Sequence, residues 1–486
     1  MRNIIIYTTI CLTAVMSVLS SCEKTMDINK DPNYPGDVPI SMLLPSAELS
    51  FAGILGGEME LVGSMWCQHY TQNVGANQYN TTVNYTISNT SYPRFWSIPY
   101  THSLPDLKII AQKAIEEGAD NYYMVSEIMT CFIYHILANW YENIPYSEAL
   151  MGDKQLYPKY DNGKAVNRAL IERLNTALGK AKSAAKSKVL MGKEDIINGG
   201  DMNKWVQFGN SLKLKLLMLD FNNNKATIEA LLAENNFLKS DCKIDLFTNK
   251  ENNSNPLYEY DRRKLNTDQN LAASKTLVKF LNKHDDPRIE AFYERNKIGG
   301  YYGLDQGVSP NLNFFIFIAV CRAKLAPQDP VYFISYAETC FLKAEAYARL
   351  GRANEAKAAY NSAVTAAFER WGYNAQTFIK DGGPYALNTS SVETMLKSIL
   401  TQKWVASARS QAWDSFFDIN RTGIPALGSK LASDDAYTVG ELAPVIDSAL
   451  NPDEYPKRMI YTKISTENNP YAPEPLSLTQ KQWWHK

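Results

Sequence analysis

The sequence is poor in the residues that usually build metal and disulfide sites, and it has no excess of either charge. Its 486 residues include only seven cysteines and five histidines, and 50 Lys and Arg residues balance 51 Asp and Glu residues. A nucleic-acid surface normally appears as a basic excess or stripe. The composition therefore argues against nucleic acid as the main partner.

The cysteines downstream of residue 22 are odd in number and contain no C-x-x-C pair, which excludes a simple disulfide framework and a zinc site of the usual spacing. We expect these five to behave as buried small hydrophobes; they are Cys67, Cys131, Cys242, Cys321 and Cys340.

Motifs of known catalysts are also missing. No histidine forms H-E-x-x-H, and the chain has no G-x-S-x-G, P-loop or G-x-G-x-x-G sequence. His69 is expected to lie on an apolar helix and is interpreted as a core residue. The sequence thus predicts no catalytic residues, no metal site, no cofactor and no enzyme. A hydrolase that uses two carboxylates is the remaining enzymatic alternative.

The chain does contain what a large folded protein needs. Hydrophobic residues make up 45% and charged residues 21% of the sequence, which is typical of a globular protein. Tyrosine is abundant, with 29 copies beside 18 Phe and 9 Trp. Tyrosine has an apolar face and a polar tip, so it serves both cores and wet recognition surfaces.

The first residues predict export and lipidation. A mostly apolar run at 4–19 follows Arg2 and ends in Leu-Ser-Ser-Cys, which resembles a bacterial lipobox. We expect residues 1–21 to be a lipoprotein signal peptide, Cys22 to be acylated, and residues 22–45 to form a lipidated tether. The alternative is an ordinary cleaved signal with an incidental cysteine. No later segment is interpreted as a membrane span, so attachment would depend on the acyl chains.

Apolar residues at i, i+3 and i+4 spacing predict long helices throughout the rest of the chain. The segments are 107–117, 122–141, 164–188, 205–221, 335–351, 353–371 and 392–407. Strand-like runs are few. The fold class predicted is mainly α, with residues 46–486 forming a single large domain.

One helical pair has a specific signature. Small and aromatic residues at 335–371 fall at the relative positions of a tetratricopeptide repeat, in which small residues let two antiparallel helices approach closely. The matching residues are Tyr347, Gly351, Ala356, Tyr360 and Ala363. The usual Trp and Pro of the repeat are replaced by Cys340 and Phe368. Segments 122–141 and 164–188 are expected to form a further hairpin.

Long irregular loops carry the candidate binding residues. These loops cover 75–93, 249–268, 299–313, 382–391 and most of the chain after 429, and loops of such length are often functional. Aromatic rings pack on sugar faces and amides suit hydroxyls, so a concave cluster of both would suit a glycan. The candidate ligand-binding residues are Asn77, Tyr79, Tyr85, Tyr258, Tyr301 and Tyr302. The alternative is that these tyrosines seal loops onto helices; Trp483 and Trp484 would then be the next aromatic candidates.

Several motifs in one order resemble a known family. They are D-I-N-K-D-P-N at 27–33 after Cys22, W-Y-E-N-I-P-Y-S-E-A at 140–149, N-S-L-K-L-K at 210–215, D-P-R at 286–288, the hairpin at 335–371, Q-K-W-V-A at 402–406 and R-T-G-I-P at 421–425. Together they resemble the SusD/RagB-like outer-membrane lipoproteins of Bacteroidetes, in particular the SusD-like, starch-binding-associated branch. Tyr141 stands where that pattern has Gly.

The resemblance implies tetratricopeptide-like repeats, with loops and additional helices forming a ligand-binding face. It also implies a lipid anchor in the outer membrane facing the cell exterior, no catalytic residues, and a SusC-like TonB-dependent transporter as the partner that receives the ligand. The expected function is binding of a nutrient, with an oligosaccharide or polysaccharide favoured. A peptide ligand, or a surface scaffold without a nutrient ligand, is the alternative.

Overall fold

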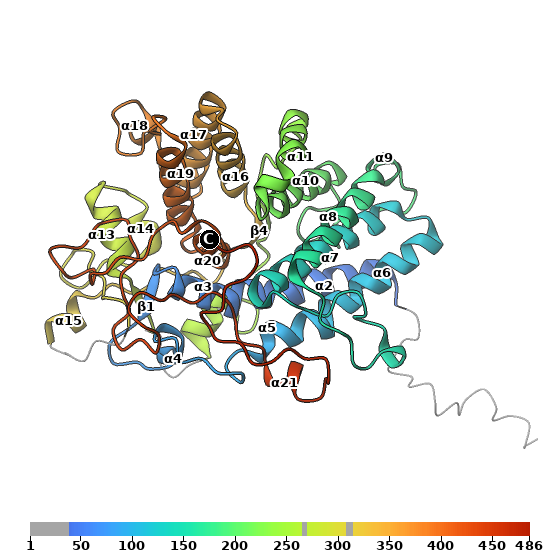
Figure 1. Cartoon of the computed structure of the whole chain (residues 1–486), viewed down its shortest axis with the longest axis horizontal. Helices are drawn as coiled ribbons and strands as arrows, with labels where there is room; N and C mark the ends of the chain where they lie inside the picture. Colours follow the sequence, from blue (N-terminus) through green and yellow to red (C-terminus); the bar gives the residue numbers. More distant parts are fainter. Residues whose placement is uncertain (1–37, 265–269, 308–313) are drawn as a thin grey trace, which may run out of the picture.

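The computed structural model describes residues 38–264, 270–307 and 314–486. Helices dominate it, as predicted, and long loops wrap the lower face in the view of Figure 1. The expected signal peptide, the lipidated Cys22 and most of the expected tether lie outside the described residues. The part of the tether that is described already contains a helix, because α2 begins at Ile40 rather than after residue 45.

The first described helix runs through the centre of the protein. Helix α2 (Ile40–Ile54) continues through a π-helical turn, η1 (Leu55–Met59), into α3 (Glu60–Trp66). This Ile40–Trp66 run is long and apolar enough to pass for a membrane span by length and composition, the one such run found in the described part of the chain. Every residue of α3 is buried, so here the run serves as a core helix.

The N-terminal half adds a layer of helices around α2. Its long members confirm the predicted segments, except for the helix at Phe221–Glu234, which was not predicted. The 164–188 segment is divided between two helices, α8 and α9. The remaining elements are α4 (Asn80–Val83), α5 (Pro93–Ile98), η2 (Pro99–Ser103), α6 (Leu104–Glu117), α7 (Asp120–Tyr141), η3 (Gly152–Lys154), α8 (Gly163–Gly179), α9 (Ala181–Ala184), α10 (Met202–Met218) and α11 (Phe221–Glu234).

The C-terminal half contains the predicted repeat hairpin. Ser335 begins its first helix with a capping box, since its hydroxyl accepts from Glu338 N at 3.1 Å. Ala356 is fully buried between the helices. The elements are α12 (Pro256–Tyr258), η4 (Glu259–Arg263), α13 (Lys275–Lys283), α14 (Ile289–Phe292), α15 (Phe314–Ala319), α16 (Tyr336–Arg349), α17 (Ala353–Glu369), α18 (Gln376–Ile379), α19 (Val392–Ser407), α20 (Ala412–Thr422) and α21 (Lys463–Thr466).

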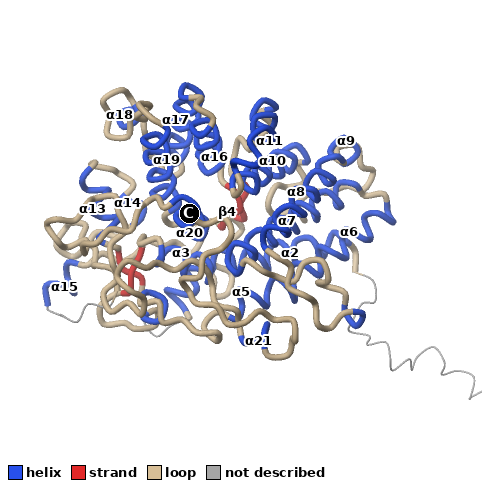
Figure 2. The backbone as a smooth tube through the Cα atoms, in the orientation of Figure 1, coloured by secondary structure: helices blue, strands red, loops and turns tan. Residues whose placement is uncertain are grey.

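The described β-structure consists of two small antiparallel pairs, shown as the short red segments of Figure 2. Strand β1 (Tyr70–Gln72) pairs with β3 (Leu271–Ala273), and β2 (Cys242–Ile244) pairs with β4 (Val331–Ile334). Each pair joins segments that are distant in the sequence. The pair β1–β3 fixes the base of the loop that begins at Asn73, which matters for the site described below.

Helices α3 and α20 touch at backbone level. A Cβ on Gly63 would lie 2.4 Å from Trp413 N, so only glycine fits there. Beside this contact, Glu60 Oε2 accepts a hydrogen bond of 2.8 Å from Ala412 N. The first and last long helices of the described chain therefore share one core.

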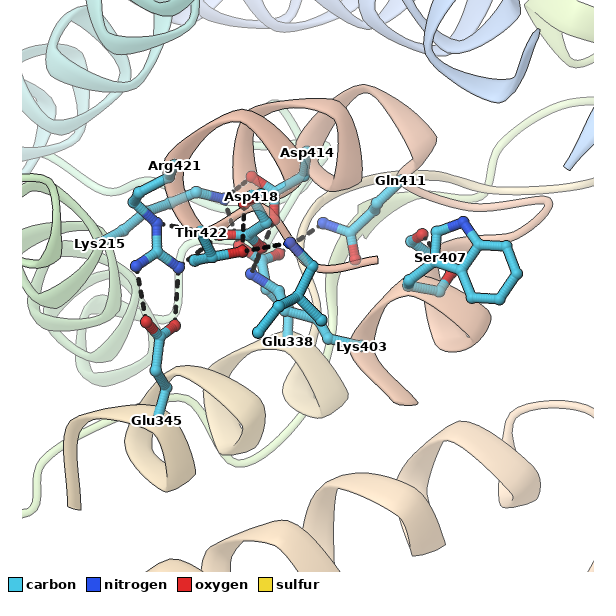
Figure 3. A network of polar contacts seen from close by, with 12 residues as sticks. Lys215, Glu338, Glu345, Lys403, Ser407, Gln411, Asp414, Asp418, Arg421 and Thr422 are labelled. Carbon is cyan, nitrogen blue, oxygen red and sulfur yellow. Dashed lines mark hydrogen bonds and ion pairs between the residues drawn. The ribbon is translucent and has the colours of Figure 1, made fainter. Parts of the chain in front are cut away.

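Buried charged residues join the repeat hairpin to α10, α19 and α20 (Figure 3). The Lys215 ammonium pairs with both Glu338 and Asp414, and the Lys403 ammonium pairs with Asp414 at 3.1 Å and also with Asp418. All five side chains are at least 87% buried. Burial alone would raise the pKa of Asp414, but the charges of Lys215 and Lys403 outweigh it and hold the pKa below its usual value.

The other expectations about buried residues are also tested by the structure. All five described cysteines are buried and free of disulfides, as predicted. His69 is fully buried, and its Nε2 lies 3.0 Å from Trp404 O, which confirms a core role, although it sits in the turn after α3 rather than on a helix. Trp484 is only 6% exposed, so the expectation of an exposed aromatic pair at 483–484 is wrong for this residue.

Candidate functional site

The predicted loop tyrosines do not all reach the surface. Tyr79 and Tyr85 are each only 6% exposed. Tyr79 N donates to Gln72 Oε1 at 2.7 Å, and the Tyr85 ring packs edge-on against Trp66 at 6.2 Å. The expectation that these two rings stand on an exposed platform is therefore wrong. They seal the 75–93 loop onto α3, helped by Trp66 Nε1, which donates to Thr82 O at 3.0 Å.

Tyr258 is half-buried and lies in a different place from the other candidates. It sits on α12, where its backbone N donates to the Asn255 side chain at 3.1 Å. The Arg263 guanidinium lies 5.3 Å from its ring centroid. No contact in the described structure joins Tyr258 to Tyr301 or Tyr302.

Tyr301 contacts a lining residue, Arg295, of a cavity that lies at the start of the 75–93 loop, although neither Tyr301 nor Tyr302 lines it directly. This loop-edge cavity has a volume of about 320 Å³ and is lined by Asn73, Val74, residues 294–297, Phe317, Ile318, Val320 and Arg322. Arg295 stands 5.3 Å from the centroid of Tyr301. The structure thus brings one edge of the predicted Gly75 loop and the predicted Tyr301–Tyr302 segment to one place. Asn77 is exposed and lies two residues beyond Gly75.

The loop argument missed two phenylalanines on α15: Phe317, which lines the cavity, and Phe315, which is close to it in the chain but is not a lining residue. Phe315 and Phe317 on α15 are 52% and 49% exposed. The Phe315 ring meets Tyr302 edge-on at 6.3 Å. A Cβ on Gly75 would lie only 3.2 Å from Phe317, so glycine lets the loop rest against that ring. The sequence signal for these two phenylalanines is the apolar run at 314–319, which directly follows a polar loop.

The polar groups of the cavity are fixed by short-range hydrogen bonds. Asn296 Oδ1 accepts from Ile298 N at 3.1 Å and Gly300 N at 2.8 Å, while its Nδ2 donates to Ala319 O at 2.6 Å. Asn73 N donates to Asn270 O at 2.8 Å, which holds the start of the other loop next to β3. The cavity wall is therefore formed before any ligand arrives.

Most charges at this cavity are paired. Arg295 donates to Glu290 at 2.5 Å, and Arg322 pairs with Glu294. Lys297 is the one lining cation that has no acidic partner among the described residues. Burial raises the pKa of Tyr301, so its hydroxyl stays protonated at neutral pH. Half-exposed rings beside amides and neutralised charges are suited to a neutral polar ligand.

The described residues contain no group of three or more His, Cys, Asp or Glu side chains placed to hold a metal ion. His69 and His135 are buried in the core, and burial lowers the pKa of each to about 3. These histidines remain neutral at physiological pH.

Comparison with known proteins identifies the family. Residues 33–461 match the family profile named SusD-like and described as "Starch-binding associating with outer membrane". The chain belongs to this SusD-like family, whose description is one of binding rather than catalysis and which associates with the outer membrane. No curated protein sequence matches the chain.

Solved structures share the fold across nearly the whole chain. A SusD homolog from Bacteroides uniformis is 23% identical, with a TM-score of 0.74 over 93% of this chain and 100% of its own. A chitin-binding SusD homolog from Flavobacterium johnsoniae is 18% identical, with a TM-score of 0.72 over 90% of this chain and 98% of its own. A SusD/RagB family protein from Bacteroides thetaiotaomicron is 20% identical, with a TM-score of 0.71 over 92% and 99%.

Proposed function

We propose that this protein is a cell-surface lipoprotein that binds a neutral oligosaccharide or polysaccharide at the loop-edge cavity and delivers it to a SusC-like TonB-dependent transporter. The observation that carries the proposal is the half-exposed Phe317 ring, which lines the cavity together with Asn73, Asn296 and paired charges. Exposed apolar surface that is rimmed by polar residues is a common mark of a ligand-binding groove. Family membership supports both the binding role and the outer-membrane location.

Tyr301, Tyr302 and Asn77 are assigned to the ligand site as part of this proposal. Tyr302 lies between two partners, since the Lys275 ammonium is 5.1 Å from its ring and Phe315 meets its edge. Tyr79 and Tyr85 support the site only indirectly, by fixing the loop that carries Asn77.

The test is calorimetric titration of the purified soluble chain with a panel of oligosaccharides. Chitin oligosaccharides belong in the panel because a similar structure is described as a chitin-binding SusD homolog; starch oligosaccharides and short peptides complete it. Phe317→Ala should weaken glycan binding by roughly fivefold to a hundredfold, the range of a hot-spot contact. Affinity should change little with salt, since a neutral sugar has no charge to screen.

Tyr471→Ala is a matched control, because Tyr471 is 51% exposed and lies on a C-terminal loop away from this cavity. It should bind as the wild type does. Peptide binding without any glycan binding would replace the glycan by a peptide, and equal affinities for wild type and Phe317→Ala would remove the loop-edge cavity as the site.

A further inference from the structure

A second cavity, about twice the volume of the loop-edge cavity, is separate from the site proposed above. It has a volume of about 660 Å³ and lies between α2, Arg94, Ile196 and the segment 244–264. Pockets of roughly 300–1,000 Å³ are typical of small-molecule sites. We call it the α2 cavity. None of its lining residues lines the loop-edge cavity.

One wall of the α2 cavity is a stripe on helix α2. Pro45, Leu49 and Gly53 follow one another at intervals of four residues, so they share one helix face. Leu49 is 50% exposed. A Cβ on Gly53 would meet nothing within 4 Å, although glycine inside a helix is less stable than alanine by roughly 1 kcal/mol. At Gly53, helix α2 therefore presents only its backbone to the cavity.

The rest of the lining contains an apolar patch and four uncharged polar residues, Thr248, Asn252, Asn253 and Ser254. Ile244, Leu246 and Phe247 come from β2 and the chain that follows it, and Pro256 from α12. Leu246 is 63% exposed. Prolines offer no N–H, and the amides of α2 are used mainly within the helix. A ligand backbone rich in N–H and C=O groups would find few partners along the α2 stripe and the apolar patch, and each buried unpaired group costs about 1–3 kcal/mol.

One end of the cavity is polar and centred on Tyr260. Its hydroxyl donates to Glu58 Oε1 at 2.8 Å and accepts from Arg94 Nη1 at 2.5 Å. A Cβ on Gly57 would lie 3.0 Å from the Tyr260 ring, so glycine lets the ring lie against η1. The Lys264 ammonium stands 4.8 Å from the ring centroid.

The charges of the lining are mostly positive. Arg94, Lys250 and Lys264 are the lining cations, and Glu259 is the lining anion. The Glu259 carboxylate is already paired with Arg263 at 3.2 Å. Arg94 lies 3.7 Å from Glu58, whereas Lys250 and Lys264 form no ion pair with a carboxylate of the described residues. The lining thus has cationic groups, Lys250 and Lys264, available for an anion.

We propose that the α2 cavity binds an anionic amphiphile, that is, a molecule with a linear apolar chain and a carboxylate head. The chain would lie along the Pro45–Leu49–Gly53 stripe and the head would face Arg94, Lys250 and Lys264. The lining supports both parts of such a ligand. Its apolar residues favour an alkyl chain over a polar backbone, and its cations favour a negatively charged head. This site is independent of the glycan site and does not depend on the proposed function.

The probe is decanoate, kept below the concentration at which it forms micelles, and compared with 1-decanol and decyltrimethylammonium by calorimetric titration of the full mature chain. Decanoate should bind at least about fivefold more tightly than decanol, and the cation more weakly than either. Gly53→Leu should fill the cavity and weaken decanoate binding by about tenfold or more. Gly179→Leu is the matched control, since a Cβ on Gly179, also in a helix, likewise meets nothing within 4 Å.

Leu49→Glu provides a second variant should Gly53→Leu fail to fold. Leu49 is half-exposed, so the fold should tolerate the change, while the new carboxylate would repel decanoate. Leu190→Glu, at a site 85% exposed, should leave binding unchanged. Three outcomes would overturn the proposal. The first is equal affinity for the three head groups, and the second is unchanged decanoate binding by both cavity variants. The third is binding of an apolar peptide such as Leu-Leu-Val in place of decanoate. Loss of glycan binding in Phe317→Ala has no bearing on it.

Discussion

Arg421 and Glu345 form a two-pronged ion pair that ties helix α20 to the repeat hairpin. Arg421 Nη1 lies 2.6 Å from Glu345 Oε1, and its Nη2 lies 2.7 Å from Oε2. The two side chains are only 7% and 1% exposed. Burial alone would raise the pKa of Glu345, but the charge of Arg421 outweighs it, so the carboxylate stays ionised. Two parallel hydrogen bonds fix the orientation of one helix on the other.

Arg421→Met should therefore leave a buried carboxylate without its main partner and destabilise the protein by roughly 3–5 kcal/mol. Urea unfolding followed by circular dichroism measures this. Arg352→Met is the control, because the Arg352–Glu355 pair on the same hairpin is more than 40% exposed and should hardly affect the midpoint. Adding Glu345→Met to Arg421→Met should recover much of the loss; no recovery would contradict a specific pairing.

Ala356→Leu should overpack the space between α16 and α17. Ala356 is fully buried, and extra methylenes in a filled core destabilise by about 1–3 kcal/mol. Ala358→Leu on the exposed side of the same helix is the control and should melt like the wild type. A melting temperature of Ala356→Leu equal to that of Ala358→Leu would show that the hairpin has unfilled space at this position.

Asp286 should give the protein an acid-sensitive contribution to stability. Burial acts to raise the pKa of Asp286, but the charge and hydrogen bonds of Arg288, together with a 2.7 Å bond from the Tyr385 hydroxyl, hold the pKa below its usual value. A lowered carboxyl pKa stabilises the fold above the unfolded pKa of about 4, and this stability is lost as the pH falls through the folded value.

The measurement is the difference in unfolding free energy between the wild type and Asp286→Asn across pH. It should be constant from about pH 5 to 7 and shrink below about pH 4. Asp381→Asn serves as the control: Lys357 also holds the pKa of the Asp381 carboxyl below its usual value, but this carboxylate is 89% exposed, so the change should be much smaller. A difference that grows on acidification would contradict the assignment.

Cys22→Ala should abolish acylation and release the protein from the outer membrane. Several acyl chains are needed for stable attachment, and Cys22 is the expected point of attachment. Metabolic labelling with a fatty-acid probe, followed by fractionation, checks both points. Cys67→Ala should keep the label, since Cys67 is buried in the core. Label retained on Cys22→Ala would contradict the lipoprotein prediction.

The helices were predictable because their signals are local. The apolar spacing of 122–141 and the small residues of 335–371 are properties of the segments themselves, and α7, α16 and α17 appear there. The binding loops were not predictable in the same way. Tyr85 is buried because its ring packs on Trp66, and Phe317 fits beside the loop because residue 75 is glycine. Neither neighbour can be identified from the spacing of residues in the sequence.

The α2 cavity illustrates the same limit. Gly53 looks like a helix weakness in the sequence, and Tyr260 looks like one more loop tyrosine. Their roles appear only once the 244–264 segment lies across α2. Family membership, in contrast, was visible from short motifs, because residues such as Pro145 and Pro287, which follow the ends of α7 and α13, are local signals.

The backbone contact between Gly63 and Trp413 has a consequence for how the protein acquires its fold. The hydrogen bond beside it, from Ala412 to Glu60, spans 352 positions. Contacts of such long range form slowly, because a long loop must close before they contribute. In refolding experiments, amide protection in α3 and α20 should therefore rise together and late. A fragment that stops before α20 would present an uncovered apolar helix and should aggregate.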